Sequence, residues 1–353
     1  MTMMAGSTRP VTGGVDTHKD THVAAVVDPL GGVLGTASFP NQAHSFSALL
    51  AWMRGHGPLE LVGVEGTGSY GAGLARFLRV EQVSVVEVNR PDRAARRTDG
   101  KSDTLDAIEA ARAALSGRAH AIPKAGDGIV EAIRVLRTAR RSAMQSRTQC
   151  ANQIHTLVDT APDPVRVQLA GQALAGIIAR APLLTVGTDL ADPAACAPWT
   201  LQTLATRWAF LDDQLADLDH HLDRLVPRAA PSLVAQFGVG TDTAGALLVA
   251  AGDNPERLRS EAAFAALCGV APLPASSGKT NRHRLNRGGN RDANQALWRI
   301  ALVRMAHDPD TRTYVARRTG DGLSKREILR VLKRYIARQL FPHLAHLAGP
   351  PPP

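Results

Sequence analysis

The sequence predicts an α/β domain at its N-terminal end, followed by two mainly helical regions. Apolar runs and helical periodicities alternate over residues 11–120. Leucines then recur at three- and four-residue steps over residues 200–226, and residues 232–345 continue in a helical pattern. We therefore expect an α/β domain at 11–120, a helical region at 127–226 and a third domain at 232–345, ahead of a disordered proline-rich tail at 346–353.

The first domain alternates strand and helix signals in the order βββαβαβα. The expected strands are Val11–Asp16, His22–Asp28, Val33–Phe39, Leu59–Glu65 and Val83–Val88, and the expected helices are His44–Arg54, Gly71–Arg79 and Asp103–Leu115. The turn residues Pro29-Leu30-Gly31-Gly32 join the second and third strands into a hairpin. This order is that of a ribonuclease-H-like domain, although a fold alone does not specify a function.

The middle of the chain favours two long helices. Residues 127–160 are expected to form one arginine-rich helix, and residues 200–226 form a second one with a leucine stripe. Such a stripe is a packing seam, so we expect a coiled-coil-like antiparallel pair or a subunit interface. The arginines of the first helix, Arg134 and Arg141 among them, would by default be solvated, but contact with a DNA or RNA backbone is expected here. Residues 161–199 are expected to be a linker or short helices.

Four acidic residues are the strongest chemical signal. Asp16 and Glu65 each end an apolar run, and Asp103 and Asp106 lie three residues apart at the start of a helical pattern. Carboxylates at strand ends and on one helix face can converge on a single point. Because such carboxylates repel one another unless a cation lies among them, they predict a Mg²⁺ site, with Mn²⁺ as the second choice, and a phosphodiester substrate.

Simpler explanations exist for single members of this set. A lone aspartate after a strand is usually a turn former, and Asp103 alone could be a helix cap. Neither explains Asp106, one turn further along the same helix face. His18 flanks Asp16 in sequence and is expected to be an ordinary surface histidine, with contact to DNA as the alternative.

A loop in the last third of the chain is small, hydroxyl-rich and strongly basic. Its cations are Lys279, Arg282, Arg284, Arg287 and Arg291. Such a loop can clamp a phosphate backbone and place a serine hydroxyl beside a phosphodiester. The segment Gly278-Lys279-Thr280 is not a nucleotide-binding P-loop, because Leu273 stands where that motif needs glycine. No nucleotide cofactor is expected.

The segment around Gly238 and Gly240 resembles a helix-hairpin-helix element. A Gly-x-Gly turn at a helix start exposes backbone N–H groups on which a DNA phosphate can dock. An ordinary turn between helices is the alternative.

Composition favours a nucleic-acid partner. The 353-residue chain carries a formal net charge of +9, while aromatic residues make up only 4%, so base stacking is not expected to dominate binding. The three cysteines lie far apart and show no zinc spacing, which fits a reducing cytosol. Without a signal peptide or a membrane-length apolar run, we expect a cytoplasmic, nucleoid-associated protein with no membrane partner.

Several short blocks together resemble one known family. Gly14-Val15-Asp16-Thr17-His18-Lys19, Val64-Glu65-Gly66-Thr67-Gly68-Ser69-Tyr70 and Lys101-Ser102-Asp103-Thr104-Leu105-Asp106-Ala107 resemble the signature blocks of the DEDD transposases of the insertion sequence 110 family. Cys268-Gly269-Val270-Ala271-Pro272, followed by Ser277-Gly278 and the basic run, resembles the C-terminal block of that family. The pilin-inverting recombinases are relatives with similar blocks. The resemblance covers roughly residues 11–345.

That resemblance implies a RuvC-like catalytic domain whose metal-binding carboxylates are Asp16, Glu65, Asp103 and Asp106. It also implies a serine nucleophile at Ser277, with the adjacent Ser276 as the alternative. Family members exchange DNA strands at the ends of their element and at its target, guided by a structured non-coding RNA. They act as homo-oligomers, here expected to be a dimer or tetramer.

Two other functions compete with a recombinase that forms a serine–DNA intermediate. One is a RuvC-like metal-dependent endonuclease or junction resolvase, in which water cleaves the DNA and the C-terminal region only binds. The other is a nucleic-acid-binding protein with a decayed site, against which the intact set of four carboxylates argues.

Overall fold

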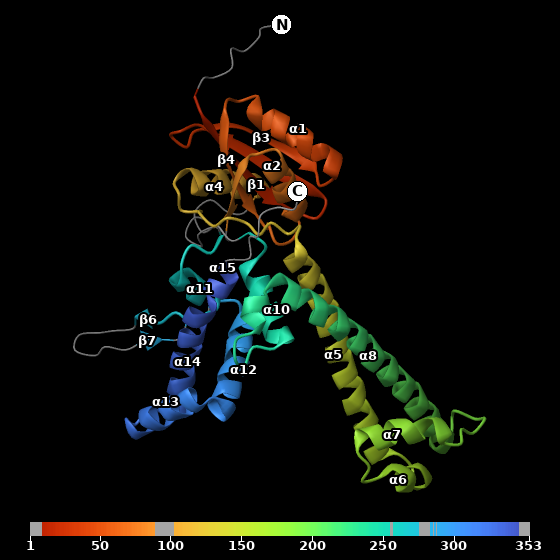
Figure 1. Cartoon of the computed structure of the whole chain (residues 1–353). Helices are drawn as coiled ribbons and strands as arrows, with labels where there is room; N and C mark the ends of the chain where they lie inside the picture. The colour runs from red at the N-terminus through yellow and green to blue at the C-terminus, as the bar shows by residue number, and fades with distance from the viewer. Residues whose placement is uncertain are drawn as a thin grey trace. The chain divides into compact units, whose positions relative to one another are not determined.

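The computed structural model describes residues 9–88, 102–254, 257–274, 283–284, 286 and 288–345, with the backbone alone at residues 283, 284 and 345. The chain divides into two compact units. The sheet unit comprises Met1–Val130, Ala250–Asn294 and Arg330–Pro353, and the helical unit comprises Glu131–Val249 and Gln295–Leu329. Figure 1 shows the elements of both in chain order.

The sheet unit is built on a five-stranded sheet with the order β3-β2-β1-β4-β5. The strands are β1 (Val11–Thr17), β2 (Thr21–Val27), β3 (Val33–Pro40), β4 (Leu59–Glu65) and β5 (Ser84–Val88). The first three strands pair antiparallel, and β4 and β5 continue the sheet parallel to β1. β1 is central, with both neighbours paired and all seven residues buried. The predicted hairpin turn is confirmed, with Gly31 at φ +82° and Asp28 accepting hydrogen bonds from the N–H groups of Leu30 and Gly32.

Helices cover both faces of this sheet (Figure 1). Helices α1 (Ala43–Arg54) and α2 (Ala72–Val80) pack on one face, where Leu49 and Leu74 join a core with Val15, Val62 and other strand residues. Helix α4 (Asp103–Leu115) packs on the other face, where Ala107 meets Val23 and Ala25. Neighbouring residues of β2 thus point to opposite sides, as the two-residue period of a strand requires.

Helix α4 lies unusually close to the sheet. A Cβ atom added at Gly14 would lie 2.2 Å from the carbonyl oxygen of Ala107 and 2.2 Å from the backbone nitrogen of Ala111. The buried face of α4 is made of alanines, at positions 107, 110, 111, 113 and 114. Small residues on both surfaces therefore allow backbone to approach backbone.

The helical unit is dominated by two long helices, α5 (Ile129–Thr160) and α8 (Pro193–Ala229). Three contacts join them: Arg140 with Asp219, Arg147 with Asp212, and Cys150 with Leu204. From one contact to the next, the residue number rises along α5 and falls along α8. The helices are therefore antiparallel, which confirms the antiparallel pair, while the coiled coil stays a prediction. The short-helix alternative for the intervening segment is also confirmed, by α6 (Asp163–Leu169), α7 (Leu174–Arg180) and the 3₁₀ turn η1 (Ala181–Leu183).

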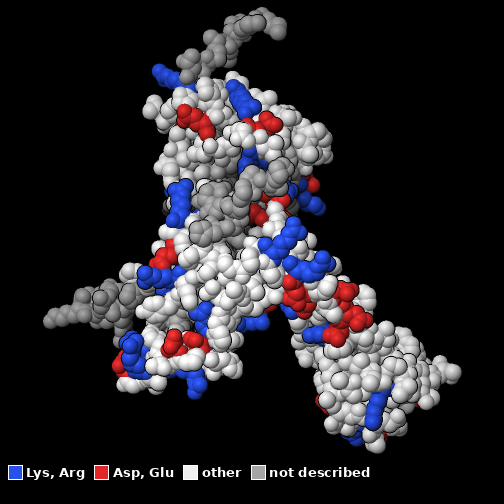
Figure 2. Space-filling model, in the orientation of Figure 1, with Lys and Arg blue, Asp and Glu red and all other residues white. Residues whose placement is uncertain are grey.

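The far end of this helical pair has a different surface from its shaft. Figure 2 shows acidic and basic side chains side by side along the shaft, whereas the end that carries α6 and α7 presents mostly uncharged side chains in this view. Beneath that end, Ile154, Leu169, Ile177 and Leu201 form a fully buried apolar core. Burial of large aliphatic side chains stabilises a fold by about 1.5–3 kcal/mol each, so this end has a core of its own.

The remaining elements confirm a mainly helical last third. They are α9 (Pro231–Val234), α10 (Thr241–Ala251), α11 (Glu261–Leu267), β6 (Leu273–Pro274), β7 (His283–Arg284), α12 (Arg291–His307), α13 (Pro309–Gly320), α14 (Lys325–Leu340) and α15 (Pro342–Ala345). None of the helices in the described part of the chain combines the length and the apolar character that crossing a bilayer requires.

Candidate active site

The first two predicted carboxylates lie at the ends of neighbouring parallel strands. β1 and β4 pair up to Val15 and Val64, and Asp16 and Glu65 are the next residues of each strand. Side chains two residues apart share a face, so Asp16 lies on the face of Gly14, which is the face that α4 covers. Asp16 is 6% exposed.

Thr17 fastens these two strand ends together. Its hydroxyl donates a hydrogen bond to the carbonyl oxygen of Glu65 over 2.8 Å. Directly after Glu65, Gly66 adopts φ +71°, and a Cβ there would come within 2.7 Å of the Thr17 hydroxyl oxygen. The turn after β4 therefore needs a glycine, and Thr17 holds the backbone of Glu65 beside the end of β1.

The second pair of carboxylates comes from the first turn of α4. Ser102 caps this helix, because its hydroxyl oxygen accepts a hydrogen bond from the N–H of Leu105 over 3.2 Å. Asp103 is exposed and Asp106 is buried. Negative side chains are favoured in the first turn of a helix, where the backbone N–H groups point outward.

His18 joins the site, although the sequence favoured a surface histidine over a DNA contact. Its Nε2 atom lies 3.0 Å from Oδ2 of Asp16 and 3.3 Å from Oδ1 of Asp103. Ligand atoms of these three residues all lie within 4.8 Å of one another, a group that could hold a metal ion. Among the described residues Glu65 and Asp106 are not part of that tight group. The two-residue step from Asp16 is the signal that could have placed His18 on the same side of the chain.

The electrostatics of this cluster favour a bound cation. Burial raises the pKa of Asp16, the charge and hydrogen bond of His18 lower it, and the charges of Asp106 and Asp103 raise it again, so that the net shift is upward. Ionised Asp16 is thus short of compensating positive charge. Carboxylate oxygens are the ligands that Mg²⁺ prefers, and an added imidazole nitrogen also suits Mn²⁺. The cluster is compatible with a divalent metal ion.

The proposed serine loop lies for the most part outside the described residues. This applies to Ser276, Ser277, Lys279, Arg282 and Arg287, and to the side chain of Arg284. The described flanks of the loop are joined by pairing of β6 with β7, with Leu273 opposite Arg284. Arg291 begins α12 immediately after it.

Side-chain hydrogen bonds of Asn294 also connect the two flanks of that loop. Its amide donates hydrogen bonds to the carbonyl oxygens of Cys268 over 2.9 Å and Gly269 over 3.3 Å. Lys333 donates to the amide oxygen of Asn294 over 2.9 Å. Burial lowers the pKa of Lys333, and the charge of Arg330 lowers it further. The loop therefore starts and ends on one hydrogen-bonded base.

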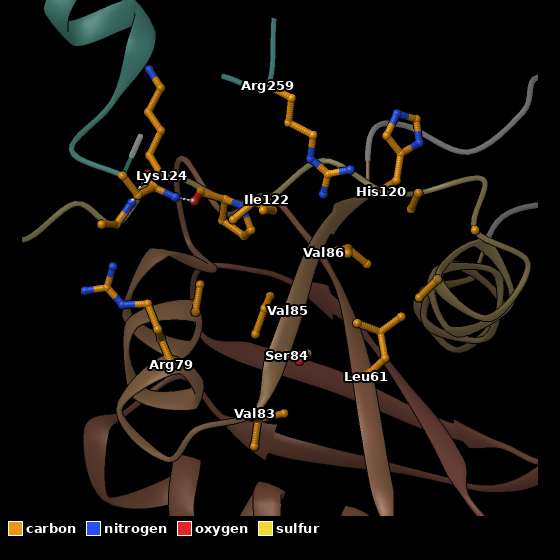
Figure 3. A pocket seen from close by; sticks show the side chains of 17 residues that line it. Leu61, Arg79, Val83, Ser84, Val85, Val86, His120, Ile122, Lys124 and Arg259 are labelled. Carbon is orange, nitrogen blue, oxygen red and sulfur yellow. Dashed lines mark hydrogen bonds between the residues drawn. The ribbon is translucent and has the colours of Figure 1, made fainter. Parts of the chain in front are cut away.

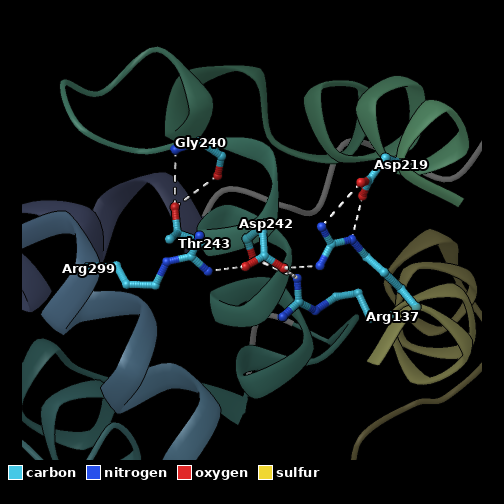
Figure 4. Close-up of polar contacts among 7 residues, drawn as sticks. Arg137, Asp219, Gly240, Asp242, Thr243 and Arg299 are labelled. Carbon is cyan, nitrogen blue, oxygen red and sulfur yellow. Dashed lines mark hydrogen bonds and ion pairs between the residues drawn. The ribbon is translucent and has the colours of Figure 1, made fainter. Parts of the chain in front are cut away.

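The Gly-x-Gly turn before α10 is more closed than the helix-hairpin-helix comparison suggests. The helix before it, α9, is a single turn of four residues. Gly238 adopts φ +78°, but the N–H of Gly240 already donates a hydrogen bond to the hydroxyl of Thr243 over 3.1 Å (Figure 4). A phosphate docking on this N–H would have to displace the Thr243 hydroxyl.

Asp242, in the first turn of α10, gathers arginines around it (Figure 4). Arg137 of α5 approaches its carboxylate to 2.5 Å, and Arg299 of α12 forms a second ion pair with it. Burial alone would raise the pKa of Asp242, but the charges and hydrogen bonds of Arg137 and Arg299 outweigh it and lower the pKa overall. Asp242 therefore holds three helices of the helical unit together.

The arginines of α5 are consequently less available to solvent and nucleic acid than predicted. Arg134 pairs with Glu131 one turn earlier, and Arg140 pairs with Asp219 of α8. These side chains are committed in part to interactions within the helical unit. Arg141 lies on the same helix and also has a partner.

The sheet domain and the acidic cluster are compatible with a DEDD-type transposase, and comparison with known proteins shows that class. Residues 13–161 match the IS110 DEDD family model, which is described as "Transposase". Residues 232–316 match a second model, described as "Transposase IS116/IS110/IS902 family". The chain belongs to this IS110 family of transposases.

A curated relative supports the same family. The "Insertion element IS110 uncharacterized 43.6 kDa protein" of Streptomyces coelicolor is 32% identical over 142 residues, or 39% of this chain. The aligned part spans only 35% of the length of that relative.

Proposed function

We propose that this chain is a DNA recombinase that cuts DNA strands and rejoins them through a covalent link to its own serine. The observation that carries the proposal is the convergence of Asp16, His18 and Asp103 within 4.8 Å at the end of the central strand. The sheet order, with β2 antiparallel and α4 over the catalytic face, supports an RNase H-like, RuvC-like assignment for residues 11–120.

Four carboxylates would hold Mg²⁺ or Mn²⁺ at this site: Asp16, Glu65, Asp103 and Asp106. His18 adds a nitrogen donor. A divalent ion bound there would neutralise charge on the phosphate oxygens and would help an attacking hydroxyl to react. Ser102 and Thr17 position the helix start and the strand end that carry these ligands.

Ser277 is the proposed nucleophile, with Ser276 as the alternative. Its hydroxyl oxygen bonds to phosphorus while the bond from phosphorus to one sugar oxygen breaks. The serine loses a proton and the departing sugar oxygen gains one. A free hydroxyl of a second strand then attacks the same phosphorus and releases the serine, so the energy of the original bond is retained and no nucleotide cofactor is needed.

Nucleic acid would be held by basic and backbone groups of the last third of the chain. The loop cations Lys279, Arg282, Arg284, Arg287 and Arg291 would neutralise phosphates, assisted by the turn at Gly238 and Gly240. A structured guide RNA would select DNA by base pairing, with Arg134 and Arg141 on its backbone. Residues 127–226 would act as a coiled-coil pair, residues 232–345 as the serine domain, and a dimer or tetramer would bring the parts of the site together.

Trapping with labelled donor DNA and Mg²⁺ tests this function. We expect the wild-type chain, supplied with its RNA, to form a covalent protein–DNA adduct and ligated products. Ser277→Ala should lose the adduct, whereas Ser116→Ala, a change at the end of α4, should keep it. An adduct that persists in Ser277→Ala but disappears in Ser276→Ala would move the nucleophile by one residue. Nicked ends with neither adduct nor ligation would indicate a RuvC-like endonuclease instead.

A further inference from the structure

A pocket of about 530 Å³ lies in the sheet unit, away from the acidic cluster. Its lining includes Ala114, near the end of α4, whereas Asp103 begins that helix. At a rise of 1.5 Å per residue, this separates the two places by roughly 16 Å. The volume lies within the range of small-molecule sites, which is about 300–1,000 Å³.

The walls of this pocket are apolar and its charged side chains are all basic. Figure 3 shows Val85 of β5 and the preceding Val83 on one side and Ile122 on the opposite side. The charged lining residues among those described are Arg79, Lys124 and Arg259.

The three cations differ in their surroundings. Arg79 is paired with Asp127, whereas Arg259 is exposed. Its guanidinium points toward the β5 side of the pocket in Figure 3. The exposed imidazole of His120 lies next to it in that view.

The wall opposite β5 is rigidly built. Asn254 accepts a hydrogen bond from the N–H of Ala125 over 3.1 Å and donates one to the carbonyl of Pro123 over 2.9 Å. Arg257 donates to the carbonyl of Ile122 over 3.0 Å. Hydrogen bonds from the side chains of Asn254 and Arg257 therefore hold this wall in place.

The floor offers a backbone donor and acceptor. β5 is an edge strand, and the N–H of Glu87 bonds outward to the carbonyl of Ala121 over 2.7 Å. Alternate residues of a strand direct their N–H and C=O groups to the same edge, so Val85 presents its own pair on the pocket side. Among the described residues, the β-bridge on this edge of β5 pairs Glu87 with Ala121 and does not include Val85.

We infer that this pocket binds an unpaired nucleotide. The edge of a nucleobase carries a donor beside an acceptor, which matches the backbone pair of Val85. The faces of the base fit between aliphatic walls, with His120 available for stacking. The phosphate meets Arg259 and Lys124. The nucleotide comes either from a single strand of nucleic acid or from the free nucleotide pool.

Calorimetric titration of the full chain in EDTA tests the site, because removal of metal prevents metal-dependent binding at the acidic cluster. The probes are adenosine, AMP and a ten-residue oligodeoxyadenylate. We expect AMP to bind more tightly than adenosine. Arg259→Ala should weaken AMP about tenfold, the loss expected for one charge-assisted hydrogen bond, and leave adenosine unchanged. Arg54→Ala, at an exposed position at the end of α1, is the matched control and should change neither affinity.

A second variant tests the apolar cavity. Ser84→Trp adds a large ring to the lining of the pocket and should abolish binding of adenosine and AMP, with an unchanged circular dichroism spectrum. Tighter binding of the oligonucleotide than of AMP, also lost in Ser84→Trp, would identify the strand as the source; equal or weaker binding would identify the free nucleotide.

Two outcomes overturn the inference: no binding of any probe, or equal effects of Arg259→Ala and Arg54→Ala. Because none of these measurements requires metal or Ser277, failure here is distinct from failure of the proposed recombinase chemistry.

Discussion

Gly14 of β1 and Gly63 of β4 lie directly opposite each other in the parallel pairing of the two central strands. Added Cβ atoms would lie 2.2 Å from the backbone of Ala107 and 2.5 Å from the carbonyl oxygen of Ala110, respectively. The two glycines thus form a flat seat for α4. Two residues after each glycine, on the same face, come Asp16 and Glu65. The seat therefore sets how near the aspartates of α4 come to the strand carboxylates.

A methyl group on this seat should disturb the fold and the site together. Gly14→Ala must push α4 away from β1, because the obstructing atoms are backbone. We expect a loss of about 2 kcal/mol in the free energy of unfolding, as for other overpacked cores, with weaker Mn²⁺ binding. Gly68→Ala, with nothing within 4 Å of its Cβ, should change stability by less than about 0.5 kcal/mol. Equal denaturation midpoints for the two variants would contradict the close packing of α4 on Gly14.

Asp16 should cost the metal-free protein stability at neutral pH. The pKa of its carboxyl is raised in the folded state. Between the unfolded and the folded pKa values, the folded chain therefore binds more protons than the unfolded chain, and the free energy of unfolding falls as pH rises. Asp16→Asn removes the penalty, and we expect about 1 kcal/mol of added stability in EDTA at pH 7. The gain should vanish in acid, below the pKa of the unfolded carboxyl. Urea unfolding at a series of pH values measures this gain in stability. An Asp16→Asn variant less stable than wild type at pH 7 would contradict the prediction.

His18 should be visible as a metal ligand. Pulsed electron paramagnetic resonance of the Mn²⁺-loaded chain is expected to show coupling to an imidazole ¹⁴N nucleus, which His18→Ala loses. Mn²⁺ affinity should fall about tenfold in that variant, and Mg²⁺ affinity less, because Mg²⁺ favours oxygen ligands. His44→Ala, at an exposed position on α1, should retain the coupling. Wild-type spectra without ¹⁴N coupling would remove His18 from the ligand set.

Asp242 should stabilise the helical unit in a pH-dependent way. Its pKa is lowered in the folded state, so its contribution is complete above the ordinary pKa of an aspartate and is lost as pH falls through the lowered value. Asp242→Asn should cost about 2 kcal/mol at pH 7, since charged hydrogen bonds to Arg137 and Arg299 weaken. The difference from wild type should shrink in strong acid. Asp217→Asn, an exposed position on α8, is the control and should be near neutral.

Local pattern was enough to predict most of the elements. The helix expected at Asp103–Leu115 has those bounds in the structure, and all five strands lie within one residue of their expected ends. Period-two and period-3.6 patterns report which faces are buried, and burial is what forms these elements. The acidic residues stood out only as a set, because turn formation or helix capping could explain single members but not Asp106.

Contacts between residues distant in sequence were beyond such patterns. The bond from Thr17 to Glu65 spans 48 residues, and the one from Arg137 to Asp242 spans 105. The arginines of α5 looked like a solvated face because nothing local announces Asp219 or Asp242 as partners. The bridge made by His18 requires α4 to be in place, since Asp103 approaches only when that helix is seated.

By itself the sequence determined the order of strands and helices and the family, because these depend on near neighbours and short motifs, and it predicted four acidic site positions. Only the tertiary structure decided that His18 lies between two of the aspartates, that α4 rests on a pair of glycines, and that an apolar pocket with a basic rim faces the edge of β5. Each of these depends on close packing of segments far apart in the chain, which near neighbours in sequence do not specify.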